Sequence, residues 1–186
     1  MVKKMTIKEL LDSVDKPVEV YKRFANEFTK DDIIYAIDKD MDIKNLVKYL
    51  KNKFDSEIIK YFIDKGMDLY YLYKYVKNKF NSELIKHAID KNACLSDLYD
   101  LLKNKFDKEL IKYAINITKY KSALYRILRD KFDKELIKYA IDKEADLKNL
   151  YFFLVDKFDE ELIQYAIKKN AALNYLRKYI LNRSWW

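Results

Sequence analysis

The sequence predicts an all-α fold, an α-solenoid of seven helix-turn-helix repeats of 26 residues. One observation is a phenylalanine that recurs at a constant interval of 26 residues, at Phe28, Phe54, Phe80, Phe106, Phe132 and Phe158. A second is the near absence of helix breakers, with one glycine and one proline in 186 residues. Apolar residues also recur within each unit at helical spacing. A period in this range is typical of stacked repeat proteins.

We expect one domain over residues 1–186, because no linker interrupts the repeat pattern. Residues 2–27 form an N-terminal capping repeat that keeps the period without the phenylalanine signature. Six regular repeats occupy residues 28–183, and residues 184–186 form a C-terminal tryptophan cap.

The two ends of the chain differ from the regular units. In the first repeat, Thr6 and Glu9 have the spacing of a capping box, and Pro17 lies near the start of the second helix. At the other end stand Trp185 and Trp186, the only tryptophans. Covering the open end of the apolar core and contacting a partner are both consistent with them.

The unit that begins at Phe54 illustrates the expected first helix. Asp55 is a good N-cap, so the helix starts there. Phe54 precedes this cap and lies five residues before Ile59, the spacing of a hydrophobic staple. The helix ends near Lys65, where Gly66 permits a left-handed backbone turn.

The second helix of the unit is expected between Asp68, a second N-cap, and Asn78, which tolerates a left-handed conformation. Its apolar stripe is Leu69, Leu72, Tyr73 and Val76. A small residue recurs inside the first helix of the regular units, at Ala36, Ala88, Ala114, Ala140 and Ala166, with Phe62 as the exception. This pattern indicates a close approach of neighbouring helices.

A column of aromatic residues follows the first helices, at Tyr35, Tyr61, Tyr113, Tyr139 and Tyr165. We expect a ladder of stacked rings between repeats. His87 occupies the corresponding position of the fourth repeat, which predicts a substituted ladder residue and not a catalytic base.

The composition argues against an enzyme or a metal protein. Cys94 is the only cysteine and His87 the only histidine, so that neither an internal disulfide nor a Cys/His metal cluster can form. No glycine-rich phosphate loop is present, and the regularly placed carboxylates serve as helix caps. We therefore expect no catalytic residues, no metal and no cofactor.

The chain also shows no signal-peptide pattern, and its longest apolar run, residues 151–155, is far shorter than the roughly 20 residues that span a bilayer. These features predict a cytoplasmic protein without a membrane partner, and a monomer is favoured. Richness in Lys, Ile, Tyr, Asp and Asn is typical of AT-rich genomes, which suits a virus, a phage or one of several bacterial groups.

The segment Glu57-Ile-Ile-Lys-Tyr-Phe-Ile-Asp-Lys-Gly-Met-Asp68 resembles the second helix and following turn of an ankyrin repeat, with its Glu-Ile-Val-Lys-x-Leu-Leu-x-x-Gly-Ala-Asp pattern. Weaker matches follow at 83–95 and 135–147. The unit is shorter than an ankyrin repeat, lacks the Thr-Pro-Leu-His motif and has no room for the β-hairpin. The resemblance implies an ankyrin-like module for protein–protein interaction without catalytic residues.

Variation among the repeats is concentrated at outward positions of the second helix, where large rings lie beside charged residues. The leading hypothesis is therefore a non-enzymatic inhibitor or adaptor that binds another protein through this face. The candidate partner-binding residues are Tyr49, Tyr71, Lys74, Tyr75, Asp97, Asp100, Arg126, Phe152, Phe153, Tyr175, Lys178 and Tyr179. Packing of several of these rings against the neighbouring second helix is the alternative.

A net charge of +8 and a pI of about 9.2 support a second hypothesis, binding of nucleic acid. The turns between repeats carry a lysine-rich ridge made of Lys51, Lys53, Lys77, Lys79, Lys103, Lys105, Arg129, Lys131 and Lys157. The 30 acidic residues are spread through every repeat, so a solvated charged edge is the competing interpretation.

The turn of the fifth repeat, residues 116–121, departs from every other copy. Lys121 stands where the other regular units have Leu or Ile. We expect a local distortion here, and the break marks a candidate contact site.

Overall fold

The computed structural model describes residues 5–93, 95–119, 121–144 and 146–169. Over these residues the chain forms thirteen α-helices and five short 3₁₀ helices, without a β-strand. The all-α prediction is confirmed for this part of the chain. The chain divides into two compact units, Met1–Leu101 and Leu102–Trp186, which are described separately below.

Unit 1 contains eight α-helices within its described residues. They are α1 (Ile7–Asp12), α2 (Val18–Arg23), α3 (Lys30–Asp38), α4 (Ile43–Leu50), α5 (Ser56–Asp64), α6 (Tyr70–Val76), α7 (Ser82–Asp90) and α8 (Leu95–Leu101). The 3₁₀ helices η1 (Lys51–Lys53) and η2 (Lys77–Lys79) follow α4 and α6. Odd-numbered helices are called A helices below, and even-numbered helices B helices.

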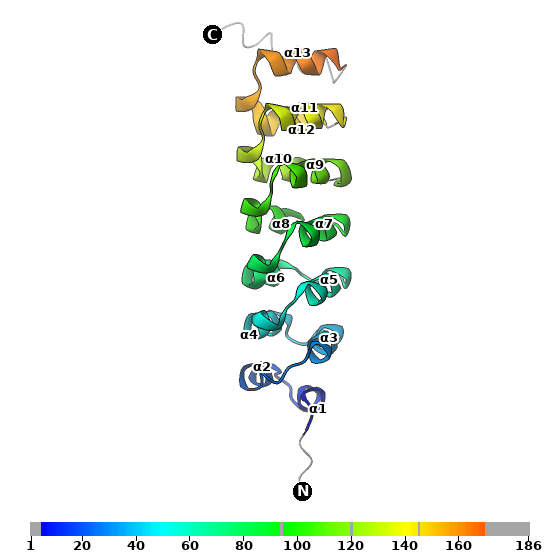
Figure 1. Cartoon of the computed structure of the whole chain (residues 1–186), viewed down its shortest axis with the longest axis vertical. Coiled ribbons are helices and arrows are strands. Elements are labelled where there is room, and N and C mark those ends of the chain that lie inside the picture. Colours follow the sequence, from blue (N-terminus) through cyan, green and yellow to red (C-terminus); the bar gives the residue numbers. More distant parts are fainter. Residues whose placement is uncertain (1–4, 94, 120, 145, 170–186) are drawn as a thin grey trace. The chain divides into compact units, whose positions relative to one another are not determined.

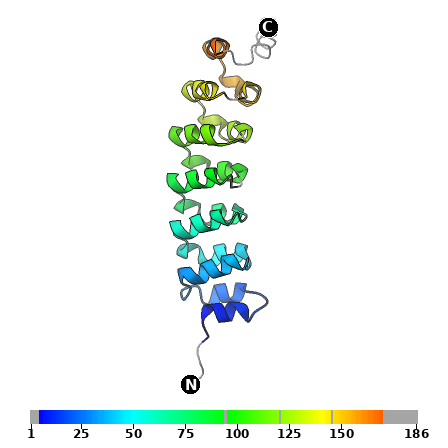
Figure 2. The ribbon, with the colours of Figure 1, turned by 90° about the vertical axis from the view of Figure 1, so that its right-hand side faces the viewer.

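The helices of unit 1 form two layers. Each A helix packs against the next A helix, from α1 through α3 and α5 to α7, and each B helix packs against the next B helix, from α2 to α8 (Figure 1). The blue-to-green helices of this unit lie one above another in the perpendicular view (Figure 2). The interior between the two layers is filled by the apolar faces of both.

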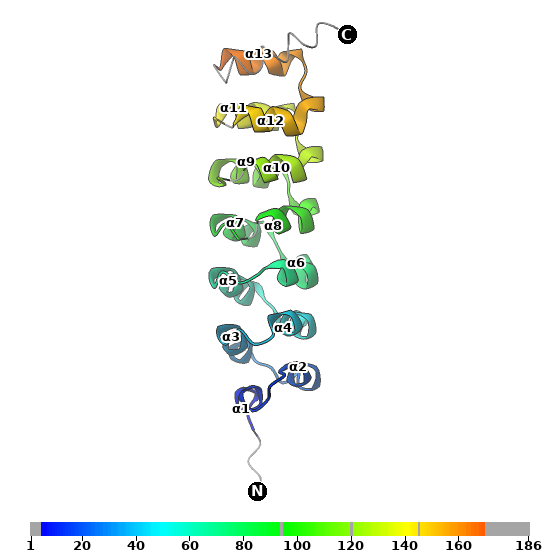
Figure 3. The ribbon, with the colours of Figure 1, turned by 180° about the vertical axis from the view of Figure 1, so that it is seen from behind.

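Unit 2 repeats this arrangement. It contains η3 (Lys103–Lys105), α9 (Lys108–Ile117), α10 (Lys121–Ile127), η4 (Arg129–Lys131), α11 (Lys134–Asp142), α12 (Leu147–Leu154), η5 (Val155–Lys157) and α13 (Glu160–Lys168). The A helices α9, α11 and α13 pack in succession, and the B helices α10 and α12 pack together (Figure 3).

Side-chain caps begin the A helices as predicted. The Asp55 carboxylate accepts a hydrogen bond from the Ile58 backbone N–H at 2.9 Å. Asn81, Asp107, Asp133 and Asp159 cap α7, α9, α11 and α13 in the same way. In the first repeat Thr6 and Glu9 form the predicted capping box. A cap of this kind contributes about 1 kcal/mol, so the repeated Asp or Asn fixes the start of each A helix.

The ends of the helices follow the prediction only in part. Gly66 takes φ +65° after α5, as expected for a left-handed turn. Helix α6 ends at Val76, and the predicted end at Asn78 is wrong because η2 continues the chain as a 3₁₀ turn through Lys79. The 3₁₀ turn satisfies the last carbonyl groups without a left-handed residue.

The recurring phenylalanines are core residues. Phe54 is fully buried, and Phe80 and Phe132 are each 2 % exposed. Each of the latter two rings packs on the tyrosine seven residues earlier in the preceding B helix, with centroids 5.1 Å apart for Tyr73 and Phe80 and 5.5 Å apart for Tyr125 and Phe132. This aromatic pair between consecutive repeats adds to the apolar burial.

Candidate functional site

The tyrosines of the A helices bond to the preceding repeat through their hydroxyl groups. The Tyr61 hydroxyl donates to the Asp38 carboxylate at 2.5 Å, and the Tyr165 hydroxyl donates to Asp142 at 2.8 Å. His87 replaces the tyrosine in this pattern, with Nε2 3.0 Å from Asp64 Oδ1. The expected ladder of stacked rings is wrong for these residues, because each ring is held by an acidic side chain 23 residues earlier.

Lysines complete the surroundings of these rings. Lys112 and Lys143 lie 5.7 and 5.6 Å from the centre of the Tyr139 ring. Lys138 and Lys169 lie 5.4 and 5.6 Å from that of Tyr165. Cation–π attraction of this kind adds about 0.5–1 kcal/mol at exposed sites. The tyrosine column of the A helices is therefore a bonding element between repeats.

Ion pairs join the A helices further. Glu135 accepts from Lys112 at 2.8 Å and from Lys108 at 2.9 Å. Both ammonium groups lower the pKa of Glu135, Lys112 having the larger effect. Lys138 and Lys134 lower the pKa of Glu161 in the same way.

The aspartates that receive the tyrosine hydroxyls also have lowered pKa values. The bonded Lys65 ammonium lowers the pKa of Asp38, and the Tyr61 hydroxyl adds to this effect. Lys169 is the main cause of the lowered pKa of Asp142. Acidic side chains on the A-helix surface are thus paired with lysines and tyrosines of a neighbouring repeat.

The predicted lysine-rich ridge lies in the 3₁₀ turns, and much of it bonds to the protein itself. Lys79 Nζ donates to the Asn52 carbonyl at 3.0 Å and to the Phe54 carbonyl at 2.6 Å. Lys53 donates to the Asn26 carbonyl of the preceding repeat, and Lys131 and Lys157 donate to the carbonyls of Phe106 and Phe132, the first residues of their own repeats. Each of these lysine side chains is therefore bonded to a backbone carbonyl 25 or 27 residues earlier in the chain.

Two other ridge residues are ion-paired, Lys103 with Asp130 at 2.9 Å and Arg129 with Asp156 at 2.7 Å. Lys105 also has a bonding partner. Lys51 and Lys77 are exposed, and their side chains form no hydrogen bond or ion pair with the described residues.

The B helices α4 and α6 present the tyrosines and lysines predicted for partner binding. Tyr49, Tyr71 and Tyr75 are half-buried, so each ring packs in part on its surroundings and exposes the rest. Lys74 is exposed, 5.5 Å from the centre of the Tyr70 ring and 5.8 Å from that of Tyr75.

Lysines of the neighbouring B helices extend this group of rings. Lys22 and Lys48 lie 5.6 and 5.1 Å from the centre of the Tyr49 ring. Lys44 lies 5.8 Å from that of Tyr71. We call this group the B-helix patch of unit 1; its members are Lys22, Lys44, Lys48, Tyr49, Tyr70, Tyr71, Lys74 and Tyr75.

The remaining predicted partner residues occupy other B helices. In α8, Asp97 is half-buried and has a bonding partner, and Asp100 is exposed. In unit 2, Arg126 of α10 is exposed, and Phe152 of α12 is 67 % exposed.

Phe153 is half-buried beside Phe152, with ring centroids 5.0 Å apart. Three further predictions, Tyr175, Lys178 and Tyr179, lie outside the described residues, as does the tryptophan cap at 184–186.

The distortion expected in the fifth repeat is confirmed. Asp40, Gly66, Asn92 and Glu144 recur at the turn between the A and B helix with positive φ. Thr118, the corresponding residue of the fifth repeat, has φ −74° and ψ 137° and is 2 % exposed. Helix α9 is accordingly ten residues long, whereas α11 has nine.

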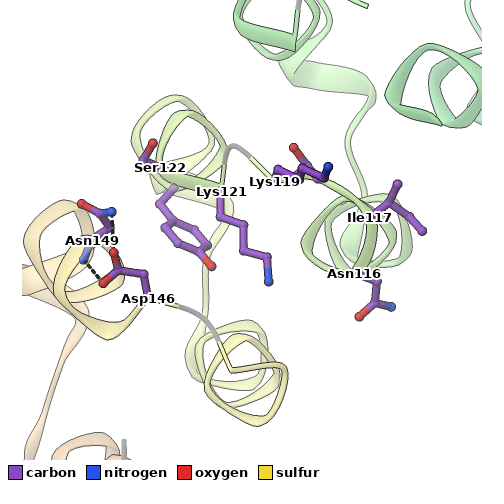
Figure 4. Close-up of a pocket in the computed structure, with 9 residues that line it drawn as sticks. Asn116, Ile117, Lys119, Lys121, Ser122, Asp146 and Asn149 are labelled. Carbon is purple, nitrogen blue, oxygen red and sulfur yellow. Dashed lines mark hydrogen bonds between the residues drawn. The ribbon is translucent and has the colours of Figure 1, made fainter. Parts of the chain in front are cut away.

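A cavity of about 540 Å³ opens at this turn. Its lining residues are Asn116, Ile117, Thr118, Lys119, Lys121, Ser122, Tyr125, Asp146 and Asn149. Figure 4 shows the Lys121 side chain extending into the space between Asp146 and the end of α9. Hollows of about 570 and 460 Å³ occur at the turns of the first three repeats, so the fifth is distinguished by its lining.

Sequence reasoning located this turn but missed Tyr125 and Asp146. Tyr125 is buried and occupies the repeat position that Tyr21 and Tyr73 occupy in unit 1, where their hydroxyls donate to the backbone carbonyls of Met41 at 2.5 Å and Ala93 at 3.1 Å. Among the described residues, the buried Tyr125 hydroxyl has no hydrogen-bond partner. The substitution at Lys121 is the one signal in the sequence that points to it.

Two further properties concern the described residues alone. They contain no group of three or more His, Cys, Asp or Glu side chains arranged to hold a metal ion. Within the same residues, every helix is too short or too polar to cross a membrane.

Comparison with protein-family models, with curated proteins and with solved structures found no match to this chain. The resemblance of its repeat to ankyrin repeats stays a prediction from the residues.

Proposed function

We propose that this chain is a non-enzymatic, ankyrin-like solenoid of seven repeats that binds another protein through its B helices, as an inhibitor or adaptor. The main support is that polar side chains have different partners on the A helices and on the B helices α4 and α6. On the A helices they bond to neighbouring repeats, whereas on α4 and α6 lysines and half-buried tyrosines face outward without ion pairs to the described residues.

The internal bonds of each unit support the solenoid. Within unit 1 the spacing of 23 residues joins Tyr35 to Asp12 and Tyr61 to Asp38. Within unit 2 the same spacing joins Tyr165 to Asp142. Bonds that recur at a fixed sequence interval are expected where identical units stack on their neighbours.

The B-helix patch of unit 1 has the composition of a protein-binding surface. Tyrosine supplies a large ring with a polar end at small cost in side-chain entropy, and such rings are enriched at interface hot spots. Lysines beside the rings attract an acidic partner and speed its association. The patch therefore fits a protein surface that combines carboxylates with apolar or aromatic groups.

Binding of nucleic acid is the second candidate, supported by the net charge of +8. The internal bonds of the ridge count against it, because Lys79, Lys131 and Lys157 would have to leave backbone carbonyls before binding phosphate. Lys51 and Lys77 are the ridge residues that best support this hypothesis, because their exposed side chains could bind phosphate without first breaking a bond to the described residues.

A pair of matched variants separates the two candidates. The first replaces Tyr71, Lys74 and Tyr75 by Ala, and the second replaces Lys51 and Lys77 by Gln. Protein capture from the source organism is expected to lose a specific partner with the first variant and to retain it with the second. The partner hypothesis fails if both variants capture the same proteins as the wild type.

The same two variants are then titrated with labelled single-stranded and double-stranded RNA and DNA, measured by fluorescence anisotropy from low salt to about 0.2 M. We expect weak binding that the first variant retains. Tight, steeply salt-dependent binding that only the second variant loses would favour the nucleic-acid candidate.

A further inference from the structure

We propose that the cavity at the turn of the fifth repeat, between α9, α10 and the start of α12, is a binding site for a single carboxylate group, held by Tyr125 and Lys121. This site lies in unit 2 and is independent of the B-helix patch proposed above for a protein partner.

The site arises where Lys121 replaces the apolar residue of the other regular repeats. At the position of Lys121, three other regular repeats have buried leucines, Leu69 at 1 %, Leu95 at 7 % and Leu147 at 3 % exposure, and the second repeat has the half-buried apolar Ile43. Lys121 is only half-buried, and its side chain extends into the cavity (Figure 4). A charged amine thus stands where an apolar side chain would close the turn.

The Tyr125 hydroxyl supplies a donor inside the cavity. The residue is fully buried, and its hydroxyl has no hydrogen-bond partner among the residues that the structure describes, although Tyr21 and Tyr73 have backbone acceptors. A buried polar group without a partner costs about 1–3 kcal/mol. An acceptor on a bound ligand would remove this cost.

The Tyr125 hydroxyl is protonated at neutral pH, as a hydrogen-bond donor must be. Burial raises the pKa of Tyr125, and the nearby Asp146 carboxylate adds to the effect. The hydroxyl therefore keeps its proton at neutral pH and can donate to an anion.

The charges around the cavity favour a monoanion. Lys119 and Lys121 form no ion pair with the described residues, so both ammonium groups are available to a ligand. Asp146 already caps α12, accepting from the Lys148 N–H at 3.0 Å and from Asn149 Nδ2 at 2.9 Å.

Two cations beside one committed carboxylate leave an excess of one positive charge. A carboxylate supplies one negative charge and two acceptor oxygens, enough for the tyrosine hydroxyl and one ammonium group. A phosphate dianion would bring a second negative charge close to Asp146, which is unfavourable.

Titration of the full chain with sodium propionate tests the proposal, followed by NMR through the backbone amides of Lys119, Lys121, Ser122 and Tyr125. We expect saturable shifts with propionate and none with propionamide, its neutral counterpart. Tyr125→Phe should weaken binding about tenfold or more, because a hydrogen bond to a charged group is lost.

Absence of saturable shifts with propionate would overturn the proposal. Equal shifts with propionamide or with phosphate, or unchanged affinity in Tyr125→Phe, would also overturn it.

Thermal stability gives a second readout that does not require a ligand. Tyr125→Phe removes a hydroxyl that has no partner among the described residues, so the Tm of the variant should equal or exceed that of the wild type. Tyr73→Phe is the matched control and should lower the Tm, because its hydroxyl bonds to the Ala93 carbonyl at 3.1 Å. An equal loss of Tm in both variants would show that the Tyr125 hydroxyl is satisfied within the fold and would overturn the proposal.

Lys121→Leu restores the residue of the other repeats and is expected to raise the Tm and abolish propionate binding. The source of the carboxylate is distinguished with an acetylated tripeptide bearing either a free or an amidated C-terminus. Tighter binding of the free acid than of propionate would indicate a chain end of a partner protein. Tighter binding of propionate would indicate a small organic acid.

Discussion

The A helices and the B helices of this molecule use similar residues for opposite purposes. On the A helices, many tyrosine, lysine and acidic side chains have a partner in a neighbouring repeat, as Tyr61 and Lys65 have in Asp38. On α4 and α6, tyrosines and lysines contact one another mainly through cation–π geometry. Residue type alone therefore does not identify a binding surface in this chain.

The difference lies in spacing. Tyr35, Tyr61 and Tyr165 meet aspartates 23 residues earlier, and Tyr139 accepts from Asn116 at the same interval. The packing of neighbouring A helices brings residues at that interval together. In α4, no acidic residue lies 23 residues before or after Lys44 or Lys48. Lys74 of α6 has Asp97 at this interval, but its side chain forms no ion pair with the described residues. Recurring bonds between polar side chains stabilise the A-helix surface. The outward face of α4 and α6 has fewer such bonds, so its side chains are available to a partner.

The largest expected change in the free energy of unfolding comes from comparing a core phenylalanine with one on the B-helix surface. Phe132→Ala removes a ring that is 2 % exposed and should lower the free energy of unfolding by about 3–5 kcal/mol. Phe152→Ala removes a ring that is 67 % exposed and should change it by about 0.5 kcal/mol or less. Urea denaturation followed by circular dichroism measures both. Similar losses for the two variants would show that Phe152 is part of the core.

Acid should weaken the A-helix bonds together. The folded pKa values of Asp38, Asp142, Glu135 and Glu161 lie below their ordinary values of 3.8 for Asp and 4.5 for Glu. The stability that these groups contribute is present above the ordinary values and is lost as the pH falls through the lowered folded values. Thermal denaturation from pH 7 to pH 2 should therefore show a falling Tm below about pH 4.5. A constant Tm down to pH 3 would contradict this role.

The smallest expected effect compares two exposed aspartates. Asp38→Asn weakens the bonds to Tyr61 and Lys65 and should lower the Tm by about 1–2 °C. Asp100→Asn is the matched change on the B helix α8 and should leave the Tm unchanged, because Asp100 is exposed and without a bond to the described residues. Differential scanning calorimetry resolves such shifts. Equal Tm values for both variants would mean that the A-helix bonds add nothing to stability.

Local features could be read from single residues. Asp55 and Gly66 set the start and end of an A helix through their own side chain and backbone, so the prediction needed no neighbouring repeat. The turn at 116–121 could be located for the same reason, because Lys121 breaks a simple pattern. The tyrosine column was found, but its bonding was not, because a hydroxyl can donate to any acceptor that packing brings near.

By itself, the sequence determined an all-helical chain of 26-residue units with fixed caps, turns and apolar stripes, since these follow from spacing along the chain. Only the tertiary structure decided which polar groups are used internally. It placed Lys79 on the Phe54 carbonyl and left the buried Tyr125 hydroxyl without a partner in the described part of the chain. The physical reason is that hydrogen bonding depends on distances between groups on different repeats, and those distances are set by how the helices pack.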